Sequence, residues 1–193
     1  MLSRKAIAIM VVLSALLFIG GCANFGGYRY YTDDAGNITP RNPRFKLKGE
    51  LSNYEGDWLI DTNAIYLEIR TDIYAGSNHF DTLFHFKRFF SNGQYFGSEP
   101  YERMPTKEDF SNLNKGTIGY YTFKDEEIWV ETFARTPGYF YAGGDYFFSK
   151  HKVVNDKLIK YKEKVRCWNC GWYNVNLIYE KIEVEDLGGT PDW

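Results

Sequence analysis

The sequence predicts an all-β domain: an antiparallel up-and-down barrel of eight strands with one short helix between strands. Apolar and polar residues alternate with a period of two in segment after segment, the pattern of half-buried antiparallel strands. Aromatic residues make up 19% of the chain, and their flat rings pack well on a pleated surface. Short turn motifs separate the segments, and closing such a series into a barrel leaves no strand edge unpaired.

The predicted strands follow one another from residue 57 onward. In the first strand, Ile65 and Leu67 alternate with Tyr66 and Glu68. Asn92-Gly93 predicts a primed hairpin turn, because both residues adopt positive φ easily. Strands are predicted at 57–70, 81–91, 94–99, 116–124, 127–134, 139–153, 157–166 and 172–183.

Other short motifs mark where the strand pattern changes. Asp125-Glu126 and Asn155-Asp156 predict further turns, and Gly143-Gly144 predicts a bulge or bend. Between two strands, Thr106 is placed to cap a short helix with Asp109 in its first turn. The sequence therefore predicts one or two helical turns here.

The first 22 residues have the order of a secretory leader. Arg4 and Lys5 precede the apolar run 6–19, and Gly20-Gly21-Cys22 follows it. This arrangement resembles the lipobox of bacterial lipoproteins, which implies cleavage before Cys22 and a lipid attached to it. An ordinary cleaved signal and an uncleaved anchor helix are the alternatives. The apolar run is shorter than the roughly 20 residues of a membrane helix.

The chain then divides into a lipoprotein signal peptide (1–21), a lipidated N-terminus with a flexible tether (22–50), and the barrel domain (51–193). Glycines, prolines and well-spaced cations in the tether favour a spacer over contact with anionic lipid headgroups. Ala23, not Asp, follows Cys22, and in Gram-negative lipoproteins this implies the outer membrane. We expect a lipid-anchored protein of the bacterial cell envelope, with the membrane as a partner.

Charge argues against a nucleic-acid partner. Two of the 23 basic residues, Arg4 and Lys5, lie in the leader, which leaves 21 basic against 25 acidic residues. A nucleic-acid-binding domain normally has a basic face on a basic domain. The sequence also has no Gly-x-Ser-x-Gly, no His-Glu-x-x-His and no phosphate-binding glycine loop. We therefore expect a protein that is not an enzyme and uses no cofactor or metal.

Cys167 and Cys170 lie in a Cys-Trp-Asn-Cys motif between two predicted strands. An exported compartment permits disulfides, so a structural disulfide or two idle thiols rank first. A redox pair ranks second, because strands flank the motif instead of the helix N-terminus that lowers a thiol pKa. A metal half-site ranks third, because the histidines lie far away in the sequence.

Several segments of the barrel domain carry a family pattern, namely 61–68, 83–86, 89–93, 115–121, 128–131, 155–159 and 190–192. With them, residues 57–192 resemble the lipocalin-like lipoproteins of Bacteroidota. Gly56-Asp57-Trp58 is similar to the Gly-x-Trp that opens many lipocalins, where the tryptophan closes one barrel end. The resemblance implies a calyx-type barrel and no particular activity.

Two charged residues share the phase of apolar neighbours. Arg88 is in phase with Phe84, Phe86 and Phe90, and Glu163 is in phase with Tyr161. A charge inside the barrel must be paired or ligand-bound. An interior Arg88–Glu163 pair, an anion-binding arginine, and two side chains that reach water at strand ends are the alternatives. The candidate ligand-binding residues are Phe84, Phe86, Arg88, Tyr121, Trp129, Tyr161 and Glu163.

These observations favour a binding module for a small apolar ligand or an envelope protein partner. The alternative is a structural or assembly lipoprotein whose barrel is filled by side chains and takes no small molecule. An enzyme, such as a glycan hydrolase, ranks last.

Overall fold

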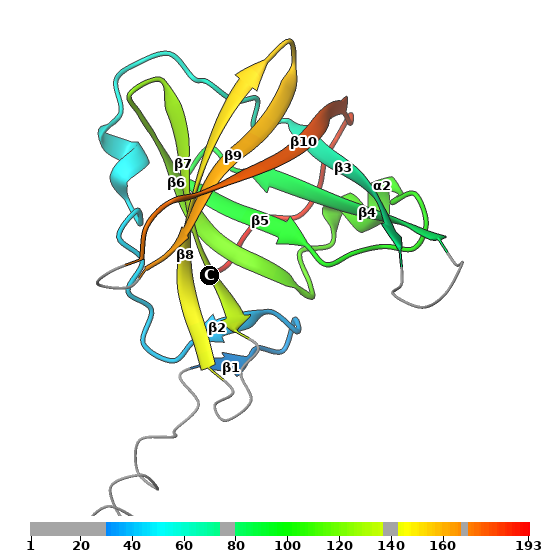
Figure 1. Ribbon diagram of the computed structural model, residues 1–193, viewed down its shortest axis with the longest axis horizontal. Helices are drawn as coiled ribbons and strands as arrows, with labels where there is room; N and C mark the ends of the chain where they lie inside the picture. The colour runs from blue at the N-terminus through cyan, green and yellow to red at the C-terminus, as the bar shows by residue number, and fades with distance from the viewer. Residues whose placement is uncertain (1–29, 74–79, 137–142, 167–169) are drawn as a thin grey trace, which may run out of the picture.

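Eight antiparallel strands close into a barrel in the computed structural model, which describes residues 30–73, 80–136, 143–166 and 170–193. The strand order is β10-β3-β4-β5-β6-β7-β8-β9, so strands that follow each other in sequence pair in space (Figure 1). The predicted up-and-down barrel is confirmed. Its strands are β3 (Ala64–Ile73), β4 (Phe80–Phe89), β5 (Gln94–Ser98), β6 (Gly116–Lys124), β7 (Glu127–Thr136), β8 (Gly143–Val154), β9 (Lys157–Val165) and β10 (Tyr173–Glu183).

Two hairpins use primed turns. Asp125 and Glu126 have φ values of 53° and 59°, and Asn155 and Asp156 have values of 50° and 60°. Two consecutive positive φ values define the type I′ turn, whose twist matches that of the strands it joins. The polar side chains at these positions therefore set the β6–β7 and β8–β9 registers.

The hairpin between β4 and β5 differs from the predicted primed turn. Positive φ occurs at Gly93 (85°) but not at Asn92. The Phe90 amide donates to the carbonyl of Gln94 at 3.0 Å, so three residues form the loop. This is a turn followed by a left-handed glycine, the next most common hairpin connection.

The short helix between strands is confirmed as α2 (Lys107–Ser111). The Thr106 hydroxyl accepts from the Asp109 amide, and the Asp109 carboxylate accepts from the Thr106 amide. This reciprocal capping box satisfies two amides that a helix start leaves unpaired. Arg103 donates to the same carboxylate at 2.6 Å, which with the cap lowers the pKa of Asp109 to about 2.

The first barrel strand is shorter than predicted. It begins at Ala64, not residue 57, because the preceding segment covers the barrel end beside the four-residue 3₁₀ helix η1 (Glu50–Asn53). Leu51 and Ile60 are buried there, whereas Trp58, the expected plug, is half-exposed against Phe123. The described part of β8 starts at Gly143, and residues 139–142 of the predicted strand lie outside the described residues.

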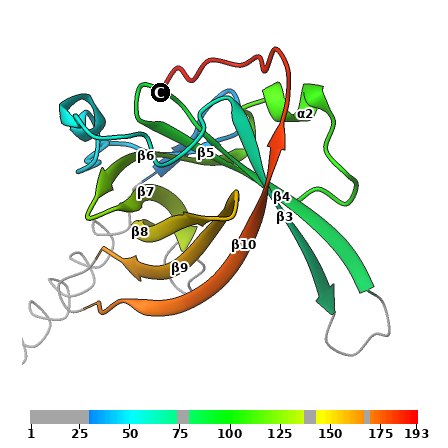
Figure 2. The same ribbon diagram turned by 90° about the horizontal axis from the view of Figure 1, so that it is seen from above.

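Buried apolar side chains form two clusters on opposite sides of the barrel wall. The inner cluster fills the barrel half beside η1, and the outer cluster packs beneath α2 and the C-terminal segment. Figure 2 shows α2 and the C-terminal segment on the outside of the barrel. The inner cluster contains Leu51, Ile60, Ala64, Tyr66, Phe89, Tyr95, Tyr121, Phe123, Ile128, Val130, Leu158 and Tyr179. The outer cluster contains Ile65, Leu67, Phe86, Phe96, Phe110 and Ile118.

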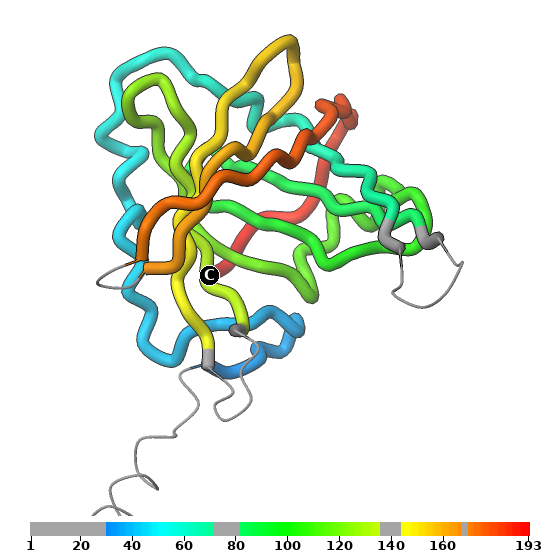
Figure 3. The backbone as a smooth tube through the Cα atoms, viewed as in Figure 1, coloured from blue at the N-terminus to red at the C-terminus, as the bar shows by residue number. Residues whose placement is uncertain are grey.

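Residues 30–48, predicted as part of a flexible tether, pack on the barrel instead. They form a hairpin of β1 (Tyr30–Thr32) and β2 (Ile38–Pro40), and the chain then runs along the barrel to its other end (Figure 3). Asn37 is buried and bonds across to Leu113 and Gly116. The glycines and prolines shape this hairpin and do not make the segment flexible. Residues 22–29 lie outside the described residues.

Candidate functional site

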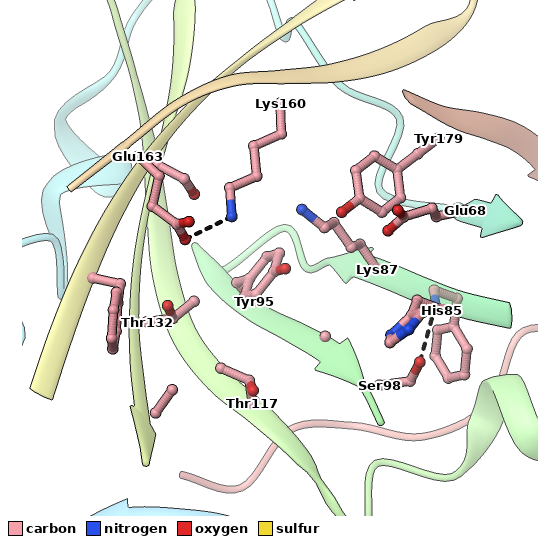
Figure 4. Close-up of a pocket in the computed structure, with 15 residues that line it drawn as sticks. Glu68, His85, Lys87, Tyr95, Ser98, Thr117, Thr132, Lys160, Glu163 and Tyr179 are labelled. Atoms are coloured by element: carbon pink, nitrogen blue, oxygen red, sulfur yellow. Dashed lines mark hydrogen bonds and ion pairs between the residues drawn. The ribbon is translucent and has the colours of Figure 1, made fainter. Parts of the chain in front are cut away.

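A polar cavity occupies the barrel half away from η1. Its volume is about 260 Å³, and side chains from all eight barrel strands border it, which places it inside the barrel. Figure 4 shows these side chains converging. The lining residues that carry polar or charged side chains are Glu68, His85, Lys87, Tyr95, Ser98, Thr117, Thr132, Ser149, Lys160, Glu163 and Tyr179.

Strand alternation explains why polar groups face the cavity. On β3, Tyr66 and Glu68 face inward while Leu67 joins the outer cluster. On β4, Lys87 faces inward while Phe86 packs its ring outward on the outer cluster. Because α2 and the C-terminal segment cover the outside of these strands, the apolar face is buried on that side. The opposite face is then free to be polar.

A bulge in β9 brings two charged residues to the same face. Lys150 pairs with Lys162 but His151 pairs with Lys160, so one residue of β9, Tyr161, is unpaired. This places both Lys160 and Glu163 inward, although three positions separate them. The Lys160 amino group donates to Glu163 at 2.6 Å.

Glu163 also connects the cavity to β10. The Tyr173 hydroxyl donates to its second carboxylate oxygen at 2.8 Å. Burial and this hydrogen bond raise the pKa of Tyr173 to about 12, so the phenol stays protonated. Both oxygens of Glu163 are thus held in fixed positions.

Lys87 is the most unusual group of the cavity. Its side chain is 8% exposed, and its amino nitrogen lies 4.1 Å from the centre of the Tyr179 ring and 5.9 Å from that of Tyr95. Burial, and then the charge of Lys160, lower its pKa well below the ordinary value, outweighing the opposite effects of Glu68 and Glu163.

The buried phenols are hydrogen-bond donors at neutral pH. Burial, followed by the charges of Glu163 and Glu68, raises the pKa of Tyr95, and burial raises that of Tyr179. Figure 4 shows the Tyr179 hydroxyl beside Glu68 and the amino groups of Lys87 and Lys160 pointing toward one space. The cavity therefore offers cations, carboxylates and protonated phenols together.

His151 borders this region from β8. It is fully buried, its Nε2 lies 2.9 Å from the Ser149 hydroxyl oxygen, and its Nδ1 has no hydrogen-bond partner among the described residues. Burial, and then the charges of Lys87 and Lys160, lower the pKa of His151 well below 6.5. The imidazole is neutral in the folded protein at neutral pH.

We expect His151 to make the fold sensitive to acid. Its pKa is lower in the folded than in the unfolded chain, so below about pH 6.5 the unfolded chain binds the extra proton. The free energy of unfolding should fall by up to about 1.4 kcal/mol per pH unit from there down to the folded pKa. His151→Gln should remove this part of the slope in urea titrations at pH 7 to 5. An unchanged slope in the variant would contradict the assignment.

The structure places Arg88 on the outer side of the wall, so it neither pairs with Glu163 inside the barrel nor reaches water at a strand end. Arg88 is 4% exposed and donates to the carbonyls of Phe110 and Gly188 at 3.0 and 2.7 Å. The apolar face of β4 that carries Arg88 points outward, because α2 and the C-terminal segment cover that face. The charge of Arg88 is satisfied by backbone carbonyls there.

The other predicted ligand-binding residues divide between the two faces. Phe84 packs against the outer cluster. Trp129 lies outside, with the Lys150 amino group 4.2 Å from its ring centre, and Tyr161 donates to Glu127 beside it. Tyr121 faces inward but belongs to the filled half of the barrel. Glu163 lines the cavity with its side chain, and Phe86 only borders it.

Sequence reasoning missed Lys87, Glu68, Lys160 and the two phenols. Lys87, Glu68 and Lys160 stand on the polar face of an alternating strand, which is usually the solvent side, and the phenols are typical core residues. The one signal in the sequence was that nearly every predicted strand has a polar face. A closed barrel with so many polar faces is expected to place some polar side chains in its interior.

Cys170 is disulfide-bonded, and Cys22 and Cys167 lie outside the described residues. Within the described ranges, no group of three or more His, Cys, Asp and Glu side chains is arranged to hold a metal ion. No helix in that part of the chain is long and apolar enough to cross a membrane.

Comparisons with known proteins gave no match to a family model, a curated protein or a solved structure. The closed eight-stranded antiparallel barrel is consistent with a lipocalin-like fold. Membership of the lipocalin-like lipoproteins stays a prediction.

Proposed function

We propose that the barrel is a binding module for a small polar molecule that carries an acidic group. The observation that carries this proposal is the cavity itself, where Lys87 and Lys160 direct their amino groups into one space. A carboxylate or similar anion there accepts charge-assisted hydrogen bonds from these amines. Tyr95 and Tyr179 supply neutral donors at the walls.

The size and lining of the cavity favour a polar ligand over the apolar one expected from the sequence. About 260 Å³ is below the roughly 300–1,000 Å³ of pockets for drug-sized molecules. A lipid chain would also leave the Lys87 amine desolvated without a polar partner, which is costly. A molecule with its own hydrogen-bond acceptors satisfies this amine.

We also propose that the module acts at the bacterial envelope, anchored by lipid on Cys22 and facing away from the outer membrane. This part rests on the leader sequence alone. A lipid anchor would keep a carrier or sensor of small acids at the surface where it meets them. Labelling of the processed protein with a fatty-acid analogue, lost in Cys22→Ala, tests it.

Isothermal titration of the processed protein with lactate, acetate and neutral lactamide tests the cavity assignment. We expect lactate to bind and lactamide to bind at least about tenfold more weakly, because one charge-assisted bond contributes about 1.5–3 kcal/mol. Lys160→Met should abolish this preference. The matched control is Lys157→Met, which removes an exposed lysine paired with Glu180.

Native mass spectrometry before and after denaturation complements the titration. A released small acid would support the proposal and identify the ligand. Co-purification of a long-chain lipid, or equal binding of lactate and lactamide, would contradict it.

A further inference from the structure

Lys87 has no anionic partner although it is deeply buried. Among the described residues, no carboxylate lies within ion-pair distance of its amino nitrogen and no hydrogen bond to it is formed. Its contacts are the faces of the Tyr179 and Tyr95 rings. A buried amine without a partner is costly to fold, so its position points to a ligand that it meets in the cavity.

The charges around Lys87 come from every neighbouring strand. Glu68 on β3 and Glu163 on β9 favour the charged form, and Lys160 on β9 disfavours it. The phenols on β5 and β10 and the neutral His151 on β8 complete the surroundings. Burial and Lys160 prevail, which increases the population of the neutral, nucleophilic amine at neutral pH.

We propose that Lys87 captures the carbonyl carbon of a small 2-oxo acid as an imine, while Lys160 holds the carboxylate of the same molecule. This inference rests on the proposed function and deepens it by naming the ligand class. Lys160 donates one hydrogen to Glu163 and has two left for a ligand. The two amines thus meet the two ends of a molecule that fits a 260 Å³ cavity.

The reaction needs no oxidant or reductant. The Lys87 nitrogen lone pair forms a bond to the carbonyl carbon, and one N–H proton moves to the carbonyl oxygen to give a carbinolamine. The C–O bond then breaks, a second proton leaves nitrogen, and the oxygen departs as water while nitrogen and carbon form C=N. The Tyr179 hydroxyl and Glu68 line the same cavity and are the groups that could relay these protons through water.

Reductive trapping of the full, processed chain tests the imine. The protein is incubated at pH 7 with glyoxylate or pyruvate and sodium cyanoborohydride, and the modified lysine is located by peptide mass spectrometry. We expect Lys87 to be labelled at least about tenfold faster than any exposed lysine, because each unit of lowered pKa raises the neutral fraction about tenfold.

The variants separate the roles of the two amines. Lys87→Met should abolish the fast label and Lys87→Arg should do the same while keeping a charge. Lys160→Met should slow the labelling of Lys87, because it removes a charge that lowers the Lys87 pKa, and it should remove the preference for glyoxylate over acetaldehyde. Lys157→Met, exposed and outside the cavity, should leave the fast label unchanged. Thermal unfolding of each variant establishes that it is folded.

The outcomes distinguish this inference from the proposed function. Labelling of Lys87 no faster than exposed lysines, with lactate binding intact, would overturn the imine and leave the binding module in place. If the unaltered protein neither forms the trapped adduct nor binds lactate, the imine inference and the proposed binding module are both overturned. A fast label on Lys87 that depends on the carboxylate of the probe would support both.

Discussion

Glu131→Ala should lower the free energy of unfolding by about 3 kcal/mol, because it leaves a partly buried cation and two backbone amides without their acceptor. The Glu131 side chain is fully buried on the outer side of β7. It accepts from Arg166 at 2.8 Å and from the amides of Lys46 and Leu47. One carboxylate thereby joins β7, the end of β9 and the N-terminal segment.

The same carboxylate explains why residues 44–48 are ordered. Arg166 also donates to the carbonyl of Arg44, and the Arg44 amide donates to the Tyr146 hydroxyl. Phe45 packs its ring against Tyr146 at 5.1 Å between ring centres. Without Glu131 this network loses its central acceptor, so the segment should detach before the barrel unfolds.

Urea titration and hydrogen exchange check this prediction. Glu131→Gln keeps an acceptor oxygen but loses the charge, and it should cost less than Glu131→Ala. Glu180→Ala, which removes an exposed ion pair with Lys157, should change stability by less than about 1 kcal/mol. Equal stabilities for Glu131→Ala and Glu180→Ala, or unchanged exchange protection of residues 44–48, would refute the role assigned to Glu131.

The barrel could be predicted because its signals are local. Alternation identifies a strand from its own few residues, and turn pairs such as Asn155-Asp156 separate strands within the same window. Closure then follows from the number of one-sided strands. Even the capping box at Thr106 and Asp109 is a spacing of three residues.

The cavity could not be predicted because alternation does not say which face is inside. The alternation of Leu67 and Glu68 is the same in two arrangements. The apolar face can point into the barrel, or it can point outward under a covering segment. Here α2 and the C-terminal segment, distant in sequence, provide that cover. The unpaired Tyr161 adds a second uncertainty, since a bulge reverses the phase of every residue after it.

The tether was misassigned for a related reason. Gly36 and Pro40 are typical of spacers, but they equally shape a tight hairpin. What decides between them is a partner surface, and that surface is supplied by Glu131 and by Leu113, far along the chain. Composition alone carries no information about such long-range contacts.

Gly119→Ala should destabilise the barrel by about 3 kcal/mol, at the upper end of overpacking effects. A Cβ at Gly119 would lie 2.1 Å from the Glu131 carbonyl oxygen and 3.1 Å from the Thr132 Cα. Both atoms belong to the backbone of β7, which pairs with β6 at this position. The hydrogen-bonded β6–β7 pair would have to separate locally, because no side-chain rotation relieves a clash with backbone atoms.

Gly171→Ala is the matched control, because nothing lies within 4 Å of a Cβ built there. Urea unfolding of the two variants should separate them by about 3 kcal/mol with the control within about 0.5 kcal/mol of the parent. A Gly119→Ala protein as stable as the control would show that β6 and β7 do not approach so closely. Because the obstructing carbonyl belongs to Glu131, Gly119→Ala and Glu131→Ala should disturb one contact region, and their combined cost should differ from the sum of the two.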